Sequence, residues 1–180
     1  MDFIIFDLEA TCWEGNAVGR QQEIIEIGAL RMDPYGEVHE TFQQFVKPAM
    51  QPRLSVYCKQ LTGISQGDVD RAESFSRVFA QFREWLGPDT DNMLLCSWGA
   101  KDKELIMRDM RVHQMSNGWL PPFIDLKSQY HEIKGIRRKM GLKRVLDREG
   151  FDFEGSHHRA LDDAANLCHL FRKYLDSWMF

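Results

Sequence analysis

The stretch Phe3-Ile4-Ile5-Phe6-Asp7-Leu8-Glu9 decides the fold. Its short run of β-branched and aromatic residues is typical of a strand that is buried on both faces. Because side chains alternate along a strand, Asp7 and Glu9 point to the same side. Two buried carboxylates raise each other's pKa, and a hard cation such as Mg²⁺ or Mn²⁺ relieves that cost. The pair therefore predicts a metal site or, as the alternative, a strand that has ended with both acids solvated.

Length and composition are those of an ordinary globular protein with one domain, spanning residues 1–180. The chain has 43% hydrophobic and 28% charged residues, which is usual for a soluble domain. Its 23 Lys and Arg against 27 Asp and Glu give a net charge of −4. A mildly acidic protein does not attract nucleic acid through its overall field, so any such binding must depend on local patches or on metals.

The cysteines and the N-terminal segment indicate the compartment. Four cysteines are scattered without a Cys-x-x-Cys pair, which argues against a zinc site or a disulfide framework and fits a reducing cytosol. The chain begins with a strand rather than a basic leader, and no apolar run reaches membrane-spanning length. We therefore expect a cytoplasmic protein that makes no membrane contact.

The order of the expected elements predicts the fold class. Strands over 23–30 and 39–46 follow the first strand, with the turn signal Asp33-Pro34-Tyr35-Gly36 between them, and short connections favour an antiparallel meander. The later expected elements are a helix from Ser74 or Ser76 to Leu86, a strand over 93–97, a helix over about 102–112, a strand over 123–126 and a final helix over about 159–178. A meander followed by alternating strands and helices predicts an α/β domain with a mixed five-stranded sheet flanked by helices.

A third acid, Asp102, comes between the 93–97 strand and the next helix. It lies one turn before Leu105 and Ile106, on the inward side of that helix. Helix capping is the interpretation that the local pattern favours, because Asp stabilises the positive end of the helix dipole. The same junction is where α/β proteins gather the polar groups of their sites, beyond the carboxyl ends of the strands.

Helical spacing separates the adjacent acids Asp162 and Asp163. Asp163 shares its side of the helix with Leu167, Leu170 and Tyr174, which form a packed face. Asp162 shares its side with Asn166, His169 and Lys173, which form a solvated face. An aspartate on a packed face needs a partner or a metal. Asp163 is therefore the functional candidate, and Asp162 is expected at the surface.

Two histidines precede this pair. His158 lies five residues before Asp163, at the end of a Gly-Ser loop from which its ring can project toward the acids. A histidine there can act as a general base, because its ordinary pKa is close to neutrality. The alternative for either histidine is a solvated loop residue, and for His157 we prefer it.

Taken together, these positions resemble the signature of the DEDDh 3′-to-5′ exonucleases, in the DnaQ-like branch of the ribonuclease H-like superfamily. Asp7-x-Glu9, Asp102 after Ser-Trp-Gly, and His158 before Asp163 occur in the family's order. Further similar stretches are Phe6-Asp7-Leu8-Glu9-Ala10-Thr11-Cys12, Ile24-Ile25-Glu26-Ile27-Gly28-Ala29, Leu61-Thr62-Gly63-Ile64 and Ser156-His157-His158-Arg159-Ala160-Leu161-Asp162-Asp163-Ala164. The resemblance covers almost the whole chain, and it is closest to the ERI-1-like subfamily and its bacterial relatives.

The resemblance implies a catalytic role for each of these five residues in phosphodiester hydrolysis by two divalent cations, Mg²⁺ or Mn²⁺, roughly 3.5–4 Å apart. Asp7 would bridge the two ions. Glu9 and Asp163 would complete the site of the ion that activates water. Asp102 would help to hold the second ion, mainly through waters, and His158 would take the proton from the attacking water.

The resemblance also implies contacts to the substrate. Ala10 and Thr11 would meet the terminal nucleotide, and Leu61 of the segment Leu61-Thr62-Gly63-Ile64 would pack on its base or sugar. Thr62 belongs to the same expected contact.

The segment from Arg137 to Arg144 places five cations in eight residues. A solvated helix end is the common meaning of such a run. The alternative is that Lys143 and Arg144 contact the phosphate backbone of a strand that enters the site.

The sequence therefore predicts a metal-dependent 3′-to-5′ exonuclease that releases nucleoside 5′-monophosphates from single-stranded RNA or DNA. RNA and DNA stay open, because that choice depends on contacts to the 2′-hydroxyl. The alternatives are a proofreading-type DNA exonuclease subunit and a nucleic-acid-binding module of the same fold that has lost catalysis.

Overall fold

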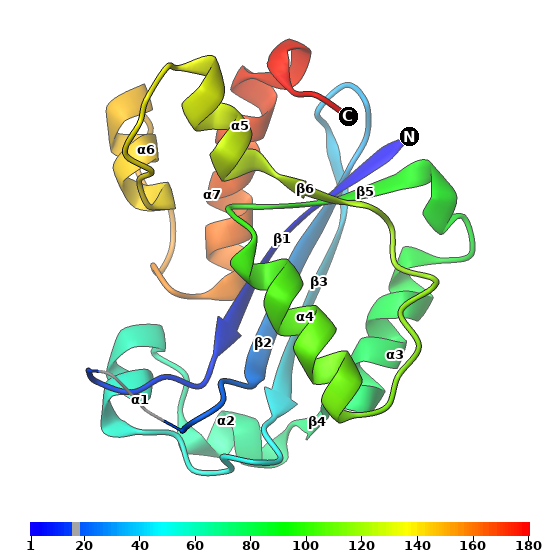
Figure 1. Ribbon diagram of the computed structural model, residues 1–180, viewed down its shortest axis with the longest axis vertical. Coiled ribbons are helices and arrows are strands. Elements are labelled where there is room, and N and C mark those ends of the chain that lie inside the picture. Colours follow the sequence, from blue (N-terminus) through cyan, green and yellow to red (C-terminus); the bar gives the residue numbers. More distant parts are fainter. Residues whose placement is uncertain (16–18) are drawn as a thin grey trace.

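The computed structural model describes residues 1–15 and 19–180. At its centre is a mixed sheet in the order β4-β3-β2-β1-β5-β6 (Figure 1). The strands are β1 (Asp2–Ala10), β2 (Ile24–Met32), β3 (Val38–Lys47), β4 (Glu73–Ser74), β5 (Met93–Ser97) and β6 (Phe123–Asp125). β1, β2 and β3 form the antiparallel meander, and β5 and β6 run parallel to β1. The five predicted strands are present, and the sixth, β4, has only two residues, too few to leave a pattern in the sequence.

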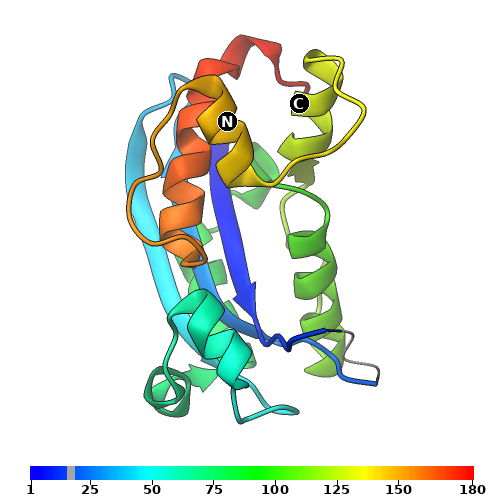
Figure 2. The same ribbon diagram turned by 90° about the vertical axis from the view of Figure 1, so that its left-hand side faces the viewer.

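Helices cover both faces of this sheet and one of its ends (Figure 2). They are α1 (Val56–Thr62), α2 (Gln66–Arg71), α3 (Phe75–Leu86), α4 (Lys101–Val112), α5 (Leu126–Ile133), α6 (Leu142–Glu149) and α7 (Ala160–Lys173). α3 and α4 pack on one face, α5, α6 and α7 on the other, and α1 and α2 enclose a smaller apolar cluster beside the end of β1. No helix in the described parts of the chain is both long enough and apolar enough to cross a membrane.

The final helix is shorter than the sequence predicts. α7 ends at Lys173 and is followed by a 3₁₀ turn over Leu175–Ser177. Trp178 then folds back, and its indole N–H donates to the carbonyl of Phe171 at 2.9 Å. The apolar residues of this segment therefore pack as expected, but in a turn rather than in a continued helix.

β1 separates two apolar layers through the alternation of its side chains. Ile4 and Phe6 belong to the layer of α3 and α4, whereas Phe3 and Ile5 belong to the layer of α7. Asp7 and Glu9 continue the row of Phe3 and Ile5 and so face the side of α7. The pairing with β2 shifts register directly after Glu9, and such irregularities often redirect a strand next to a site.

Gly28 of β2 lets the first turn of α7 lie directly on the sheet. A Cβ at this position would be 2.2 Å from the Leu161 nitrogen and 2.3 Å from the Ala160 carbonyl carbon. No other residue fits against backbone atoms at that distance. Gly28 therefore sets how closely α7 approaches β1 and β2.

Candidate active site

Four carboxylates from three parts of the chain meet beyond the carboxyl ends of β1 and β5. Asp7 and Glu9 come from the end of β1, Asp102 from the first turn of α4, and Asp163 from the first turn of α7. Glu9, Asp102 and Asp163 are only 8%, 8% and 6% exposed. Burial raises the pKa of Asp7 well above its usual range, and Asp102, Asp163 and Glu9 raise it further. The acids therefore share one cluster, as the sequence predicts.

Burial and mutual repulsion disfavour the ionised form of this cluster. The pKa of Glu9 is raised to about 8, first by burial and then by the charge of Asp163. Burial also raises the pKa of Asp102 to about 7, against the opposing effects of the Ser97 hydroxyl and Lys101. The pKa of Asp163 is raised to about 6, again chiefly by burial. A bound divalent cation would reverse this balance, because it stabilises the ionised carboxylates.

The donor atoms suit a hard divalent cation. Oxygens of Glu9 and Asp163 and a ring nitrogen of His158 lie within 4.8 Å of one another. Among the described residues, the ion-pair partners of these two acids are histidines: His158 Nδ1 lies 3.9 Å from Glu9, and His157 Nε2 lies 3.9 Å from Asp163. Carboxylate oxygens are the ligands that Mg²⁺ and Mn²⁺ prefer, so the residues present fit such ions.

The backbone holds His158 beside the acids. Its φ is +65°, a conformation that non-glycine residues seldom adopt. The N–H of His158 donates to Asp163 Oδ2 at 2.8 Å, which ties the loop to α7. Burial, together with His157, lowers the pKa of the His158 ring. An imidazole that is neutral near pH 7 has a free nitrogen to accept a proton.

His157 is exposed, as preferred from the sequence, but it is part of the same cluster. Its ring lies 4.0 Å from the ring of His158, centroid to centroid, and packs edge-on against Phe153. The sequence predicts a solvated residue at this position, because a loop histidine usually points into solvent. Only the folding of the loop against α7 shows that it reaches Asp163.

The prediction that Asp163 lies on a packed face is confirmed, because this residue is buried. The prediction that Asp162 lies on a solvated face is partly wrong. Asn166, which the helical projection places on a solvated face, is 1% exposed. Its side chain accepts from the N–H of Glu154 and donates to the Glu154 carbonyl, while Asp162 accepts from the N–H of Ser156 at 2.8 Å. The loop before α7 covers this face, so Asp162 fastens the loop and is not fully solvated.

The capping interpretation of Asp102 is wrong. The N-cap of α4 is Ala100, and no side chain caps this helix. The cap forms one helix later, where Asp125 at the end of β6 accepts from the N–H of Ser128 at 2.9 Å. Asp102 is the second residue of α4 and turns inward, which leaves its carboxylate for the cluster.

A buried ion pair fixes the start of α7. Glu26 of β2 is fully buried and lies opposite Glu9 in the sheet. Arg159 donates to it from Nε at 3.1 Å and from Nη2 at 2.8 Å, and the N–H of Ala160 donates at 3.1 Å. A bidentate guanidinium neutralises the acid nearest to Glu9 across the strands. This pair therefore holds α7, and with it Asp163, against the sheet.

A small pocket of about 120 Å³ opens beside the acids. Of the predicted substrate contacts, Ala10 and Leu61 line it, together with Glu9, Asp102 and Lys101. Lys101 belongs to no sequence motif, so only the structure shows that it lines this pocket.

The two predicted threonine contacts have hydroxyls that are engaged in the fold. Thr11 accepts from the N–H of Glu23 at 2.9 Å, and Thr62 donates to the carbonyl of Cys58 at 2.9 Å. Their contacts with substrate stay predictions.

The basic segment begins beside this edge of the sheet. The Trp98 indole, directly after β5, donates to the carbonyl of Met140 at 3.2 Å, and Lys139 donates to the Ser128 hydroxyl at 2.5 Å. Lys143 and Arg144 are exposed in the first turn of α6, and Lys143 lies 3.5 Å from Asp147. The structure therefore attaches the segment to the site's edge, and the phosphate contacts of Lys143 and Arg144 stay predictions.

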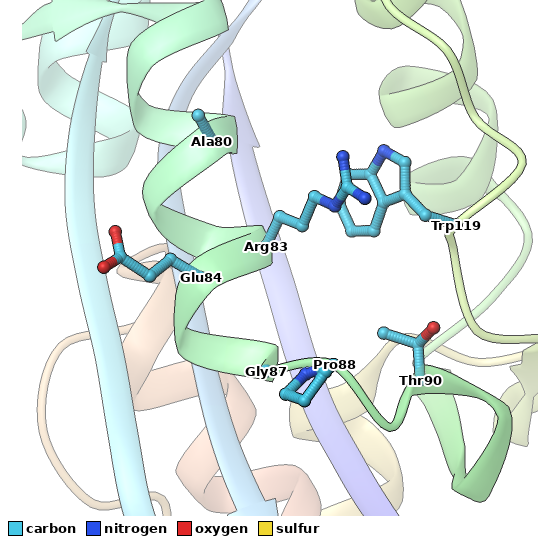
Figure 3. Close-up of a pocket in the computed structure, with 7 residues that line it drawn as sticks. All are labelled: Ala80, Arg83, Glu84, Gly87, Pro88, Thr90 and Trp119. Atoms are coloured by element: carbon cyan, nitrogen blue, oxygen red, sulfur yellow. The ribbon is translucent and has the colours of Figure 1, made fainter.

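A larger cavity, of about 430 Å³, lies at the C-terminal end of α3. Arg83 reaches across it to the Trp119 ring, 5.1 Å from the ring centroid, while Glu84 points away (Figure 3). Its lining contains none of the clustered acids. The smaller pocket, which Glu9 and Asp102 line, is therefore the candidate active site.

Comparisons with known proteins show the family of the chain. A family model described as "Exonuclease" (RNase T) matches residues 4–171. The chain is 32% identical to the 3′-5′ exonuclease eri1 of Schizosaccharomyces pombe, over 94% of this chain and 66% of that protein, and 33% identical to the 3′-5′ exoribonuclease 1 of Homo sapiens, over 94% and 51%. It therefore spans about half to two thirds of the length of these relatives.

Among solved structures, the nuclease domain of 3′hExo, a DEDDh family member bound to rAMP, superposes with a TM-score of 0.89 at 29% identity. The match covers 97% of this chain and 92% of that domain. The six-stranded mixed sheet flanked by helices is thus the ribonuclease H-like fold of these nucleases. The chain belongs to the RNase T exonuclease family and resembles, within it, the ERI1-like DEDDh nucleases.

Proposed function

We propose that this protein is a metal-dependent 3′-to-5′ exonuclease that releases nucleoside 5′-monophosphates from single-stranded RNA. The observation that carries the proposal is the cluster of four carboxylates with His158 at one end of the sheet. RNA is favoured because the human relative is named an exoribonuclease and the solved nuclease domain is bound to rAMP. The alternatives are a proofreading-type DNA exonuclease and an inactive binding module.

The proposed roles follow from the surroundings of each residue. Asp7, Glu9, Asp102 and Asp163 would hold two divalent cations, which supply a hydroxide nucleophile and neutralise the attacking and leaving oxygens. His158, with its lowered pKa, would accept the proton of the attacking water at a ring nitrogen. The Glu26–Arg159 pair would keep these groups in register.

The pocket beside the acids would hold the 3′-terminal nucleotide. Ala10 and Leu61 offer apolar contacts for its base or sugar, and Lys101 lies at the same opening. The rest of the strand would leave toward the basic segment, where cations can follow the phosphate backbone.

A strand without a free 3′-hydroxyl is expected to resist cleavage, because the pocket holds a strand end. With Mg²⁺ or Mn²⁺, 5′-labelled linear RNA should shorten stepwise, and excess EDTA should stop the reaction. The matched substrates are the same RNA with a 3′-phosphate, the same RNA circularised, and linear DNA of the same sequence. Efficient cutting of the circle would show endonuclease action, stepwise removal confined to DNA would favour the proofreading alternative, and binding without cleavage would favour the inactive module.

The stabilisation by metal is expected to grow with pH. The raised pKa values of Glu9 and Asp102, about 8 and about 7, mean that the folded protein keeps protons that the unfolded chain releases. These two acids should therefore contribute most to the stability of the metal-free protein near about pH 4, and that contribution should be lost as the pH rises to about 8. Metal competes with these protons. Mg²⁺ should thus raise Tm more at pH 8 than at pH 6 in calorimetric scans at matched ionic strength, and equal increments would contradict the assignment of the ligands.

Replacing Lys143 and Arg144 together by Ala is expected to weaken binding to long strands and leave a dinucleotide almost unaffected, because a dinucleotide is too short to reach α6. The slope of log affinity against log salt should flatten by roughly 0.7 for each lost phosphate contact on a single strand. Fluorescence anisotropy over a salt series measures this slope. Equal losses of affinity for long and short substrates would show that Lys143 and Arg144 do not contact the strand and that the segment is a solvated helix end.

A further inference from the structure

Two cysteines that are far apart in the sequence lie close together beside the candidate active site. Cys12 follows β1 and packs on the small apolar cluster that contains Cys58 of α1. Both are free thiols, and each shifts the pKa of the other. The sequence does not predict this pair, because the two cysteines do not have Cys-x-x-Cys spacing.

The surrounding hydrogen bonds fix this arrangement. The Ser55 hydroxyl donates to the carbonyl of Cys12 at 2.6 Å and accepts from the N–H of Cys58 at 2.9 Å. The Cys58 thiol in turn lies 3.8 Å from the carbonyl of Ala10. The start of α1 is thus fastened to the segment after β1, which keeps Cys12 and Cys58 close together.

The pair also borders the nucleotide pocket. Cys12 lines that pocket together with Ala10 and Leu61. Leu61 follows Cys58 by three residues on α1, so the two are neighbours on the helix. Cys12 is partly exposed, whereas Cys58 is buried. A small solute in the pocket can therefore reach Cys12, and Cys58 lies in the apolar cluster that Cys12 packs against.

The remaining two cysteines provide an internal contrast. Cys96 and Cys168 are 0% and 2% exposed within the apolar layer of α7, and burial raises the pKa of Cys168 to about 12. The neighbouring Cys12 instead lowers the pKa of Cys58 to about 7, while Cys58 raises the pKa of Cys12. A thiolate reacts with oxidants and a buried thiol does not, so the two pairs should differ sharply in reactivity.

We propose that Cys12 and Cys58 form an oxidation site, at which a peroxide converts the two thiols into a disulfide that distorts the nucleotide pocket. The bond itself is independent of the proposed function, and only its effect on catalysis rests on it.

The chemistry needs one peroxide and no other reactant. Cys58 has the lower pKa of the two thiols, so it accepts the proton of Cys12, and the partly exposed Cys12 then reacts as the thiolate. Cys12 attacks one peroxide oxygen, the O–O bond breaks, and the hydroxide that leaves takes the proton of Cys58 to form water. The Cys58 thiolate then attacks the sulfenic sulfur of Cys12, forms the S–S bond and expels hydroxide. The two sulfurs lose two electrons in total, and the peroxide gains them.

The consequence for the pocket follows from geometry. A disulfide holds its sulfurs about 2.05 Å apart, much closer than two thiols in non-bonded contact. Closing that gap draws α1 toward the segment after β1 and displaces Leu61 relative to Ala10. A displacement of about 1 Å at a reacting centre can cost roughly 10²-fold in rate, so oxidation should lower activity by about tenfold or more.

The first test follows the bond. Purified protein is treated with hydrogen peroxide, alkylated without reduction and analysed by peptide mass spectrometry. We expect a cross-linked peptide that contains Cys12 and Cys58, a mass lower by two hydrogen atoms, and full alkylation of Cys96 and Cys168 after unfolding. Cys12→Ser and Cys58→Ala should each prevent the cross-link. Thiols that stay free, or oxidation of Cys12 to a sulfinic acid without the bond, would overturn the proposal.

The second test follows the pocket. Binding of AMP with Mg²⁺ by calorimetry, and RNA cleavage, are compared for oxidised and reduced samples of the same protein. Wild type should lose affinity and rate, and dithiothreitol should restore both. For Cys58→Ala the ratio of oxidised to reduced values should stay near one. If the disulfide forms and AMP binding does not change, the proposal is overturned. A protein that cleaves no RNA in either state would refute the nuclease assignment, and the cross-link and AMP binding would then decide whether the oxidation site exists.

Discussion

The Asp163→Asn variant is expected to lose metal-dependent cleavage by about 10³-fold while it keeps its fold. Removing one preorganised electrostatic group from an active site typically costs about 10²–10³-fold, and here the lost charge also belongs to a proposed metal ligand. The amide keeps an oxygen that can accept from the N–H of His158, a bond that measures 2.8 Å in the native protein. Single-turnover rates on linear RNA measure the loss, and circular dichroism with thermal scans checks the fold.

Asp162→Asn is the matched control. Its side chain accepts from the N–H of Ser156 at 2.8 Å, and an amide oxygen can do the same. Its activity should therefore stay within a few-fold of wild type. If Asp162→Asn were inactive and Asp163→Asn active, the assignment of the two helix faces would be wrong.

Gly28→Ala is expected to reduce the free energy of unfolding by about 3 kcal/mol, at the upper end of the cost of overpacking a core. The new methyl group would meet the Leu161 nitrogen at 2.2 Å, and backbone cannot move aside as a flexible side chain can. For a protein of this size we expect Tm to fall by about 6–12 °C. Because α7 carries Asp163, the increase of Tm by Mg²⁺ should also shrink.

Gly118→Ala is the control for this substitution. A Cβ there meets only the Ser116 hydroxyl, at 4.0 Å, so Tm should change little. Urea titration of both variants gives the free energies and compares the slopes. A Gly28→Ala protein as stable as wild type would mean that α7 does not rest on β2 as described.

The sequence predicts well what depends on local periodicity. The run that ends at Asp7 and Glu9 has the continuous apolar residues of a strand buried on both faces, and the face of Asp163 has the spacing of a packed helix. Both patterns repeat over several residues, so a single exception does not mislead. The β5 boundaries, Met93–Ser97, agree with the prediction for the same reason.

The errors concern contacts made by segments that are distant or irregular. Asn166 is buried because a loop folds back onto its face of α7, and a helical projection contains no loops. Asp is a residue type that often caps helices, so the sequence favours Asp102 as the N-cap of α4. Only the structure shows that Ala100 occupies the N-cap position. Cys12 and Cys58, likewise, belong to two segments that only the tertiary structure brings together.

The division of the carboxylates between the first strand and α7 has a consequence for synthesis on the ribosome. Asp7 and Glu9 are made about 150 residues before Asp163 and its anchor Arg159. A nascent chain that ends before α7 therefore has no complete cluster of acids, whatever part of the sheet has already formed. The destructive activity proposed here would thus arise only once translation has passed α7, which protects the messenger and the ribosomal RNA beside it from the unfinished enzyme.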